Sequence, residues 1–304
     1  MRVTLIHNSK AGDDEQPGAR DLQHLITAAG HDVFYQSCHD ENWTAALARP
    51  ADLVAVAGGD GTVGRVAKAL VGRHVPFTAL PLGTANNISK TLGLTDLPLE
   101  QLIAGWARGH RTAFDIGVAG GPWGLRYFIE GMGAGLFAWN MPDAHDNGTL
   151  HNLDHADAKL ASALQLLRER LRCCAPCRFD AVLDGRDLSG DYLLLEVMNM
   201  QYVGPNLYLG PDCDLTDGLL DVVLVPAAQR ERLQAYLSTW QDGRLRAPDL
   251  PTYRGRELQV RWTGYAVHID DELWPPAKTM RAAPGAAIQI RMEREALEFL
   301  APAC

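Results

Sequence analysis

The sequence lacks any long apolar run. No stretch approaches the roughly 18–20 consecutive apolar residues that a membrane-spanning helix requires. The first residues, MRVTLIHNSKAG, lead directly into a strand-like segment, without the apolar core and cleavage site of a secretory signal. We therefore expect neither a membrane span nor a secretory leader.

Excess positive charge and a disulfide-type cysteine framework are also missing. Lysine and arginine total 28 residues against 37 for aspartate and glutamate, which gives a formal net charge of −9. Nucleic acids are bound chiefly through an excess of lysine and arginine, so this balance argues against nucleic acid as a partner. The six cysteines do not have the spacing of a disulfide framework, which favours a reducing, cytoplasmic location.

In about the first third of the chain, short apolar runs alternate with segments of helical periodicity. Strands are predicted at RVTLIHN, HDVFYQS, ADLVAVAGG and VPFTALPLG. Helices are predicted over 18–29, over 42–48, through the spacing of Val63, Val66, Ala67 and Leu70, and from NNISKTLG. This alternation indicates βαβ units in a doubly wound, mostly parallel sheet with helices on both faces.

After about residue 111 the sequence becomes rich in short strands. These are predicted at RYFIEGMGAGLF, RFDAVLDGRDL, DYLLLEVMNM, GLLDVVLV, ELQVRWTG and YAVHIDD, with helices mainly at 156–172 and 228–240. We predict an α/β domain over residues 1–115 and an all-β domain, a β-sandwich, over 116–304, with a cleft between them. The closing segment AAIQIRMEREALEFLAP is expected to form strands that can pack back on the first domain.

The turn AVAGGDGTVGRV has the residue types of a phosphate-binding loop. Gly58, Gly59 and Gly61 surround Asp60, and Thr62 is placed to cap the following helix. A strand-to-helix turn offers free backbone N–H groups and the positive end of a helix dipole to an anion. An ordinary tight turn is the alternative, although such a turn has no use for the central aspartate.

A second strand-to-helix turn is found in LPLGTANNISK. Gly83 permits close approach, Thr84 and Asn86 offer hydrogen-bonding side chains, and Asn86 or Asn87 can cap the helix that follows. In a doubly wound sheet, turns at adjacent strand ends line one crevice where ligands bind. Alone, this turn is equally well explained as helix capping, but the two turns together favour a nucleotide phosphate site.

These motifs, in their order, resemble the diacylglycerol kinase catalytic-domain family, which includes bacterial lipid kinases and sphingosine and ceramide kinases. GGDGT is followed by LPLGTANN, and HNSKAG is similar to the family's Asn-Pro-x-x-Gly turn, with Ser9 where proline is usual. FIEGMGAG, LYLGPDCDLTDGLLDVVLV, VHIDDELW and IQIRMEREALEFLAP then follow in the family's order. The resemblance covers nearly the whole chain, whereas GGDGT alone is shared with NAD kinases and phosphofructokinases.

The resemblance implies a nucleotide-binding α/β domain, a C-terminal β-sandwich, and ATP with Mg²⁺ in the cleft. The residues that it implies for the nucleotide are Gly58, Gly59, Gly61 and Thr62 at the phosphates, Gly83, Thr84, Asn86 and Asn8 along the nucleotide, and Ser37 as a further candidate. It also implies a lipid substrate met at a membrane surface by peripheral contact. The oligomeric state is left open, with a homodimer as one option.

Phosphoryl transfer gives the acidic residues a chemical role. Its catalysis is mainly positioning and electrostatic stabilisation, with metal ions between carboxylates and phosphate oxygens. Asp60 is therefore predicted as a catalytic residue that holds Mg²⁺ against the phosphates. Asp270 and Glu272 would point to one face if the strand continues through them. The resemblance favours Glu272 as the base that accepts the lipid hydroxyl's proton, with Asp270 as the second candidate.

Of two further aspartates, Asp271 departs from the family's pattern and Asp217 matches it. Asp271 stands where the family has glycine; at a positive φ it would cost about 1 kcal/mol of strain, and a solvated acidic turn is the alternative. Asp217, in CDLTDGLLDV, matches the family's ligand to a structural Mg²⁺, and a turn that starts a strand is the alternative.

Three other patterns receive mainly structural interpretations. CCAPC is read as a loop after a helix, because no second cysteine pair is present for zinc. His145, His151 and His155 are read as part of a polar lid or loop, with weak metal binding through a shared helix face as the alternative. The seven arginines within 230–261 are read as a solvated face, with contact to anionic lipid as the alternative.

The sequence thus predicts an ATP-dependent lipid kinase that phosphorylates a hydroxyl of a diacylglycerol-like lipid. A NAD kinase is one alternative, although LPLGTANN stands where such an enzyme is expected to have Asn-x-Gly-x-x-Gly-Phe. A catalytically silent nucleotide-binding protein is the other, because Asp271 and the irregular NSKAG depart from the family's pattern.

Overall fold

A computed structural model describes residues 1–303, except 14, 147–152, 154, 240–247 and 275–284. The chain divides into two compact units. The first comprises Met1–Asp115 with Glu295–Cys304, and the second comprises Ile116–Arg294. The strands β5 (His110–Gly121) and β18 (Ala287–Ala301) contribute residues to both units. Each unit is described by itself below.

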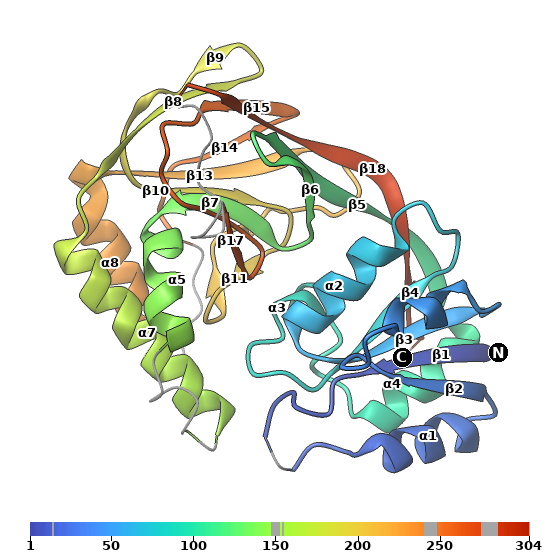
Figure 1. Cartoon of the computed structure of the whole chain (residues 1–304). Coiled ribbons are helices and arrows are strands. Elements are labelled where there is room, and N and C mark those ends of the chain that lie inside the picture. Colours follow the sequence, from blue (N-terminus) through green and yellow to red (C-terminus); the bar gives the residue numbers. More distant parts are fainter. Residues whose placement is uncertain (14, 147–152, 154, 240–247, 275–284, 304) are drawn as a thin grey trace. The chain divides into compact units, whose positions relative to one another are not determined.

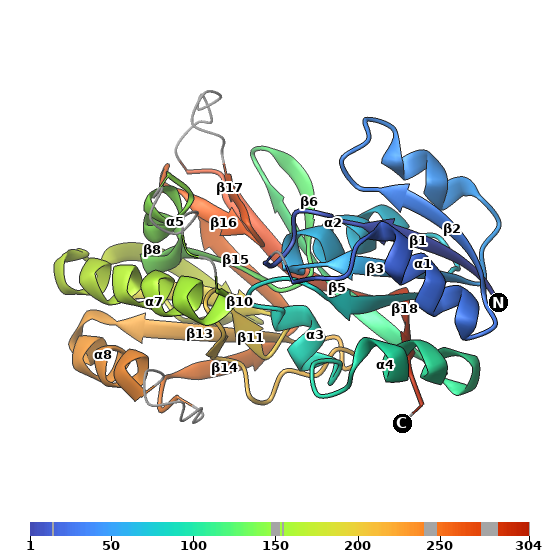
Figure 2. The same ribbon diagram turned by 90° about the horizontal axis from the view of Figure 1, so that it is seen from below.

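The first unit is a parallel sheet with helices on both faces. Its strands are β1 (Arg2–His7), β2 (Asp32–Ser37), β3 (Leu53–Gly58), β4 (Phe77–Pro81) and the end of β18, in the order β18-β4-β3-β1-β2. Its helical segments are α1 (Ala19–Ala28), η1 (Trp43–Ala48), α2 (Asp60–Leu70), α3 (Asn87–Thr91), α4 (Leu99–Gly105) and η2 (Trp106–Arg108). Figures 1 and 2 place α2 on one face of the sheet and α1 and α4 on the other. The predicted doubly wound fold is confirmed.

Hydrophobic patterning explains these elements. Every residue of β3 is buried, as expected for a central parallel strand with helices on both faces. In α2 the four apolar residues predicted from helical spacing are all buried: Val63, Val66, Ala67 and Leu70. In α1, Leu22 and Ile26 are buried and Leu25 is half-buried. The apolar stripe of each helix therefore packs on the sheet.

The C-terminal end of the chain completes the core of the first unit. Phe299 of β18 pairs in parallel register with Phe77 of β4. Its ring centroid lies 5.6 Å from that of Phe77, which in turn lies 5.7 Å from that of Phe114. Both contacts are edge-to-face, the arrangement that aromatic quadrupoles favour.

The second unit consists of antiparallel strands that pack with helices. Its strands are the end of β5, β6 (Gly124–Phe128), β7 (Gly131–Gly135), β8 (Cys177–Leu183), β9 (Arg186–Asp187), β10 (Gly190–Met198), β11 (Tyr202–Val203), β12 (Leu207–Tyr208), β13 (Leu220–Pro226), β14 (Thr252–Gly255), β15 (Glu257–Arg261), β16 (Val267–Ile269), β17 (Glu272–Trp274) and the start of β18. The helical segments are α5 (Leu136–Asp146), α7 (Ala156–Cys173), η3 (Ala227–Gln229) and α8 (Arg230–Thr239). The strands run β17-β16-β7-β10 with β13 and β14 beyond β10, while β8 joins β10 to β15 and β18.

Alternating side chains of β10 divide this unit into a sandwich core and a helix-covered face. Leu195 and Val197 belong to a core shared with β8, β15, β16 and β18. Leu194 and Met198 belong to a second core shared with α5, α7 and α8. Successive side chains of a strand point to opposite faces, so one strand serves both cores. The predicted β-sandwich is confirmed, with helices on one outer face (Figure 1).

Helix α5 was not predicted. The sequence predicts a strand that extends to Phe137 and a loop around His145, whereas Leu136–Asp146 is helical. The four residues at its start, Leu136 to Trp139, are all apolar, so the sequence has no helical periodicity there. His155 lies at the N-cap position of α7 and not within a helix, and His151 lies outside the described residues.

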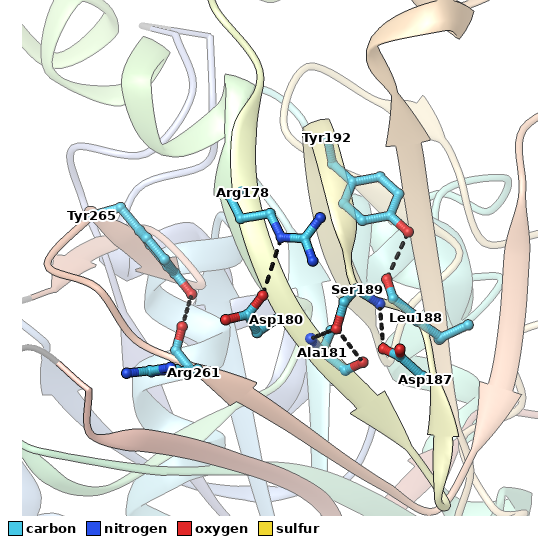
Figure 3. A network of polar contacts seen from close by, with 9 residues as sticks. All are labelled: Arg178, Asp180, Ala181, Asp187, Leu188, Ser189, Tyr192, Arg261 and Tyr265. Atoms are coloured by element: carbon cyan, nitrogen blue, oxygen red, sulfur yellow. Dashed lines mark hydrogen bonds and ion pairs between the residues drawn. The ribbon is translucent and has the colours of Figure 1, made fainter.

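Polar contacts connect β8, β9 and β10 (Figure 3). The Tyr192 hydroxyl donates to the Leu188 carbonyl at 2.6 Å, and the Ser189 hydroxyl oxygen accepts from the Ala181 amide at 3.1 Å. Arg178 Nε lies 3.1 Å from Asp180 Oδ1 on the same strand.

Among the helices that the structure describes, none is long and apolar enough to cross a membrane.

Candidate active site

Four loops of the first unit meet at one edge of its sheet. Asn8 follows β1, Ser37 ends β2, Gly59 follows β3 and Gly83 follows β4. Because these strands are parallel, their carboxyl ends lie at the same edge, which is where α/β sheets bind ligands. The structure therefore places all the predicted nucleotide residues at these strand ends, in the loops that follow them or in the first turn of α2.

The two glycine turns are in contact with each other. A Cβ atom on Gly59 would lie 3.0 Å from the Cα of Gly83, and a Cβ on Gly83 would overlap the Cα of Gly59. A Cβ on Gly58 would lie 2.9 Å from the Cβ of Thr62. Side chains at these positions would push the turns apart. Glycine is therefore needed for the turns to touch, in addition to any approach by a ligand.

Asp60 is the first residue of α2 and connects the two turns. Its Oδ1 accepts a hydrogen bond from the Ile88 amide in α3 at 2.9 Å. Burial raises the pKa of the Asp60 carboxyl, and backbone amides of Ile88 and Asn87 act in the opposite direction. The carboxylate thus stabilises the N-terminus of α3, where amides lack helical partners.

The capping predictions need one correction. Gly59 is the N-cap of α2 and Thr62 lies inside the helix, so the prediction of Thr62 as the cap is wrong. Asn86 is the N-cap of α3, with φ 53°, as one of the two predicted candidates. Its side chain, however, closes the preceding turn, accepting from the Gly83 amide at 2.9 Å and donating to the Gly83 carbonyl at 2.8 Å. Thr84 is half-buried in this turn.

Asn8 joins three of the loops. Its Nδ2 donates to Thr62 Oγ1 at 2.9 Å, and its Oδ1 lies 2.9 Å from His39 Nε2. Ser37 Oγ accepts from the His39 amide at 3.2 Å. His39 was missed by sequence reasoning because an exposed histidine in a loop belongs to no motif. The exposed Gly61 lies in the first turn of α2.

The acidic segment of the second unit is a hairpin turn. Strand β16 ends at Ile269, which pairs with Glu272 of β17, so Asp270 and Asp271 form the turn between them. The strand does not continue through Asp270 and Glu272, so the condition for both side chains to point to one face is not met. The positive φ, 51°, falls on Asp270, so Asp271 in place of glycine carries no such strain.

Asp270 and Glu272 have different surroundings. Asp270 Oδ1 accepts from the amides of Ile129 at 3.0 Å and Glu130 at 2.9 Å, and the Asp270 amide donates to the Gly131 carbonyl at 2.9 Å. The carboxylate of Asp270 therefore fixes the hairpin to the segment before β7. Glu272 is exposed, which leaves its carboxylate accessible to a proton donor.

Asp217 is paired with an arginine. Its Oδ2 forms an ion pair with Arg254 Nη2, and its Oδ1 accepts from the Leu219 amide at 2.8 Å. Arg254 Nε also lies 3.0 Å from Oδ1 of the buried Asp221. Within the described ranges, no group of three or more histidine, cysteine and acidic side chains is arranged to hold a metal ion. A metal ion at Asp217 would have to share this carboxylate with the guanidinium or displace it.

The first unit fits a phosphate group and a magnesium ion. The N-terminus of α2 has the positive end of a helix dipole and first-turn amides that lack helical partners, which is the environment that phosphates bind. Mg²⁺ usually keeps several waters and needs only one or two carboxylates together with substrate phosphates. Asp60 would supply one such carboxylate without a larger cluster.

The remaining patterns of the sequence are mainly structural where they are described. Arg230 Nη2 donates to the Cys174 carbonyl at 2.7 Å, and Arg232 Nη1 lies 3.4 Å from Asp249 Oδ2. Cys174 is the C-cap residue after α7 and Cys177 starts β8, so CCAPC links these elements, and both thiols are free. Residues 240–247 of the basic segment lie outside the described residues, and lipid contact there stays a prediction.

Comparison with known proteins gives consistent matches. Residues 2–119 match the family model "Diacylglycerol kinase catalytic domain", and residues 142–291 match "YegS C-terminal NAD kinase beta sandwich-like domain". A diacylglycerol kinase of Mycobacterium tuberculosis is 27% identical over 258 residues, which are 82% of this chain and 80% of that protein. A probable YegS-like lipid kinase of Yersinia pestis is 30% identical over 196 residues, 62% of each chain.

Solved structures share the fold. A putative diacylglycerol kinase from Bacillus anthracis superimposes with a TM-score of 0.73 at 19% identity, covering 99% of this chain and 96% of that chain. A yeast NADH kinase in complex with NADH has a TM-score of 0.53 at 10% identity, covering 99% of this chain and 83% of that chain. At these identities the likeness concerns the fold alone.

Proposed function

The chain belongs to the diacylglycerol kinase catalytic-domain family and is lipid kinase-like, and we propose that it transfers the γ-phosphoryl group of ATP to a hydroxyl of a diacylglycerol-like lipid in a Mg²⁺-dependent reaction. The observation that carries this proposal is the contact between the Gly59 and Gly83 turns beside the N-terminus of α2. This arrangement suits a polyphosphate, because glycine turns let the backbone approach a ligand closely beside a helix N-terminus, at the sheet edge where α/β folds bind ligands.

The residues take complementary roles in this proposal. The glycine turns, with Thr62, Thr84, Asn86 and Asn8, bind and orient the nucleotide. Asp60 would hold Mg²⁺, which when bound neutralises charge on the phosphate oxygens. Glu272 accepts the proton of the lipid hydroxyl as that oxygen bonds to the γ-phosphorus and the bond to ADP breaks. Asp270 holds the hairpin, in keeping with its amide contacts.

We further propose that the acceptor is met at a membrane surface. A diacylglycerol-like lipid resides in a bilayer, so the protein would contact the surface peripherally from the cytoplasm. Nucleic acid is not part of this proposal, because the net charge of −9 disfavours a polyphosphate backbone as a partner.

A substrate screen with labelled ATP tests the proposal. We expect Mg²⁺-dependent transfer of label to diacylglycerol in mixed micelles, tested beside ceramide, phosphatidylglycerol and NAD. Glu272→Gln should lower kcat about 10²–10⁴-fold, the range of general base catalysis. Glu257→Gln, which changes another exposed glutamate at the start of a strand of the same unit, is the matched control.

The outcomes separate the alternatives. Label on NAD would replace this proposal with a NAD kinase-like activity. Tight ATP binding with no labelled product on any acceptor would indicate a silent nucleotide-binding protein. Full activity of Glu272→Gln would remove only the assignment of the base.

A further inference from the structure

A buried histidine–glutamate pair lies next to the acidic hairpin. His268 Nε2 in β16 is 2.8 Å from Glu196 Oε2 in β10, and the two side chains are 4% and 0% exposed. Taking two ionisable groups out of water is costly unless they pair well, so such a pair is weak evidence for stability alone. The groups in contact with the pair indicate a role other than stability.

The pair forms across a strand that lacks a side chain at the crossing point. In the register of the sheet, both Glu196 and His268 are paired with Gly133 of β7. A Cβ atom on Gly133 would lie 3.0 Å from the Glu196 carboxyl carbon and would overlap its Oε2. Glycine at this position therefore lets the two side chains meet over β7.

The other nitrogen of His268 contacts the hairpin turn itself. His268 Nδ1 lies 3.2 Å from the carbonyl oxygen of Asp270. A carbonyl oxygen can only accept, so Nδ1 carries a proton and donates it. A second proton lies in the hydrogen bond between His268 Nε2 and Glu196 Oε2 and belongs to one of these two atoms. Both nitrogens of the imidazole therefore form hydrogen bonds.

The carbonyl, the amide and the carboxylate of Asp270 therefore all form hydrogen bonds. Its carbonyl accepts from His268, its amide donates to the Gly131 carbonyl, and its carboxylate accepts from the amides of Ile129 and Glu130. Asp270 has a positive φ, a conformation that a residue other than glycine keeps only when its surroundings hold it. The turn leads directly to Glu272.

We propose that Glu196 and His268 are positioning residues: Glu196 orients His268, and His268 fixes the Asp270 turn and thereby the Glu272 carboxylate. This inference rests on the proposed function, in which Glu272 accepts the proton of the lipid hydroxyl. It assigns a role in the reaction to two residues that touch neither nucleotide nor lipid.

Two isosteric substitutions of His268 test the inference. In asparagine the side-chain nitrogen can take the place of Nδ1, whereas in glutamine it lies closer to Nε2. Each is combined with Glu196→Gln so that no charged carboxylate is left buried without its partner. We expect His268→Asn/Glu196→Gln to stay within about threefold of Glu196→Gln alone in kcat, and His268→Gln/Glu196→Gln to fall on the order of 10–100-fold. The KM for ATP should be unchanged in both.

Hydrogen exchange of the amides of residues 129–131 gives a readout that needs no activity. These amides are bound by Asp270, so we expect faster exchange in the glutamine variant and near-normal exchange in the asparagine variant. Tyr192→Phe removes a different hydrogen bond from strand β10 and should change neither readout (Figure 3).

Each outcome has a defined meaning. Equal kcat values and equal exchange in the two His268 variants would overturn the inference. If the wild type makes no lipid product, the proposed function fails, and the exchange comparison still decides whether His268 holds the turn. If a double variant does not fold, Glu196→Gln alone is compared with wild type. Faster exchange and a lower kcat would support the role of Glu196, and wild-type values would overturn it.

Discussion

At the scale of single residues, Asp60 shows how one carboxylate can serve both structure and proposed chemistry. It starts α2 and accepts a hydrogen bond from the Ile88 amide at the start of α3. The same carboxylate is the proposed Mg²⁺ ligand. Substitutions that separate hydrogen-bond acceptance from charge can therefore separate the two roles.

Asp60→Asn and Asp60→Ala make this separation. Asparagine keeps an oxygen acceptor for the α3 amides but removes the charge, so we expect kinase activity to fall about 10²-fold or more with a small change in stability. Alanine removes both and should also lower the free energy of unfolding by about 1 kcal/mol, as for loss of a helix cap. Lipid phosphorylation and urea unfolding are the two measurements.

The control for this pair is Asp21→Ala. Asp21 Oδ2 accepts from the Gly18 amide at 3.0 Å at the start of α1, so its loss should cost stability and leave activity intact. Wild-type activity in Asp60→Asn would leave Asp60 with its structural role only.

At the scale of elements, the site depends on two strand–turn–helix units that must fit against each other. The β3–α2 and β4–α3 turns touch through Gly59 and Gly83, and Asp60 bonds across from α2 to α3. The conformation of either turn therefore depends on the other. We therefore expect a substitution in one turn to change the affinity for a ligand that contacts either turn.

Gly83→Ala tests this dependence. The added methyl would overlap the backbone of Gly59, so we expect a loss of about 1–3 kcal/mol in the free energy of unfolding, as for overpacking, together with weaker ATP binding. Calorimetric titration with ATP and urea unfolding measure the two effects.

Gly120→Ala is the matched control. A Cβ there meets chiefly the end of the exposed Leu125 side chain, at 3.2 Å, which can move aside. Both measurements should stay near wild type in this variant. Unchanged ATP affinity in Gly83→Ala would separate the contact between the turns from nucleotide binding.

At the scale of the whole molecule, the chain returns to its first unit to complete a core. Residues Glu295–Cys304 belong with Met1–Asp115, and Leu297, Phe299 and Leu300 are buried there. The Glu295 amide donates to Asp115 Oδ1 at 2.7 Å, and the Ala303 amide donates to the Gly105 carbonyl at 3.1 Å. The stability of the first unit therefore depends on the last residues of the chain.

Phe299→Ala tests this dependence. It removes a ring packed edge-to-face on Phe77, and the expected loss is about 3–5 kcal/mol, typical of truncating a buried phenylalanine. Hydrogen exchange of β3 and β4 amides measures it for the first unit specifically.

Glu298→Gln is the control, because Glu298 forms an exposed ion pair with Arg111 at 3.4 Å. Exposed pairs contribute about 0–1 kcal/mol, so exchange should change little. Unchanged exchange of β3 and β4 in Phe299→Ala would mean that the first unit does not need this strand.

The sequence by itself determined the alternation of strands and helices from β1 to α3, both glycine turns and the family resemblance, whereas α4 and β5 were not predicted. These features are local: apolar residues recur every second or every third to fourth position, and glycines follow strand ends. The sequence did not predict helix α5, because the apolar residues at its start are consecutive and have no helical periodicity. It also did not show that the turn begins at Asp270, because a single residue with a positive φ ends the strand there.

Only the tertiary structure decided which residues are partners. Asp60 and Ile88 are 28 positions apart, Glu196 and His268 are 72 apart, and Asp270 and Glu130 are 140 apart. Sheet register and strand order bring them together, and neither is encoded in a local pattern. For the same reason the sequence presented Asp60, Asp217 and Asp270 as available acids, whereas the fold gives each carboxylate a hydrogen-bonding partner.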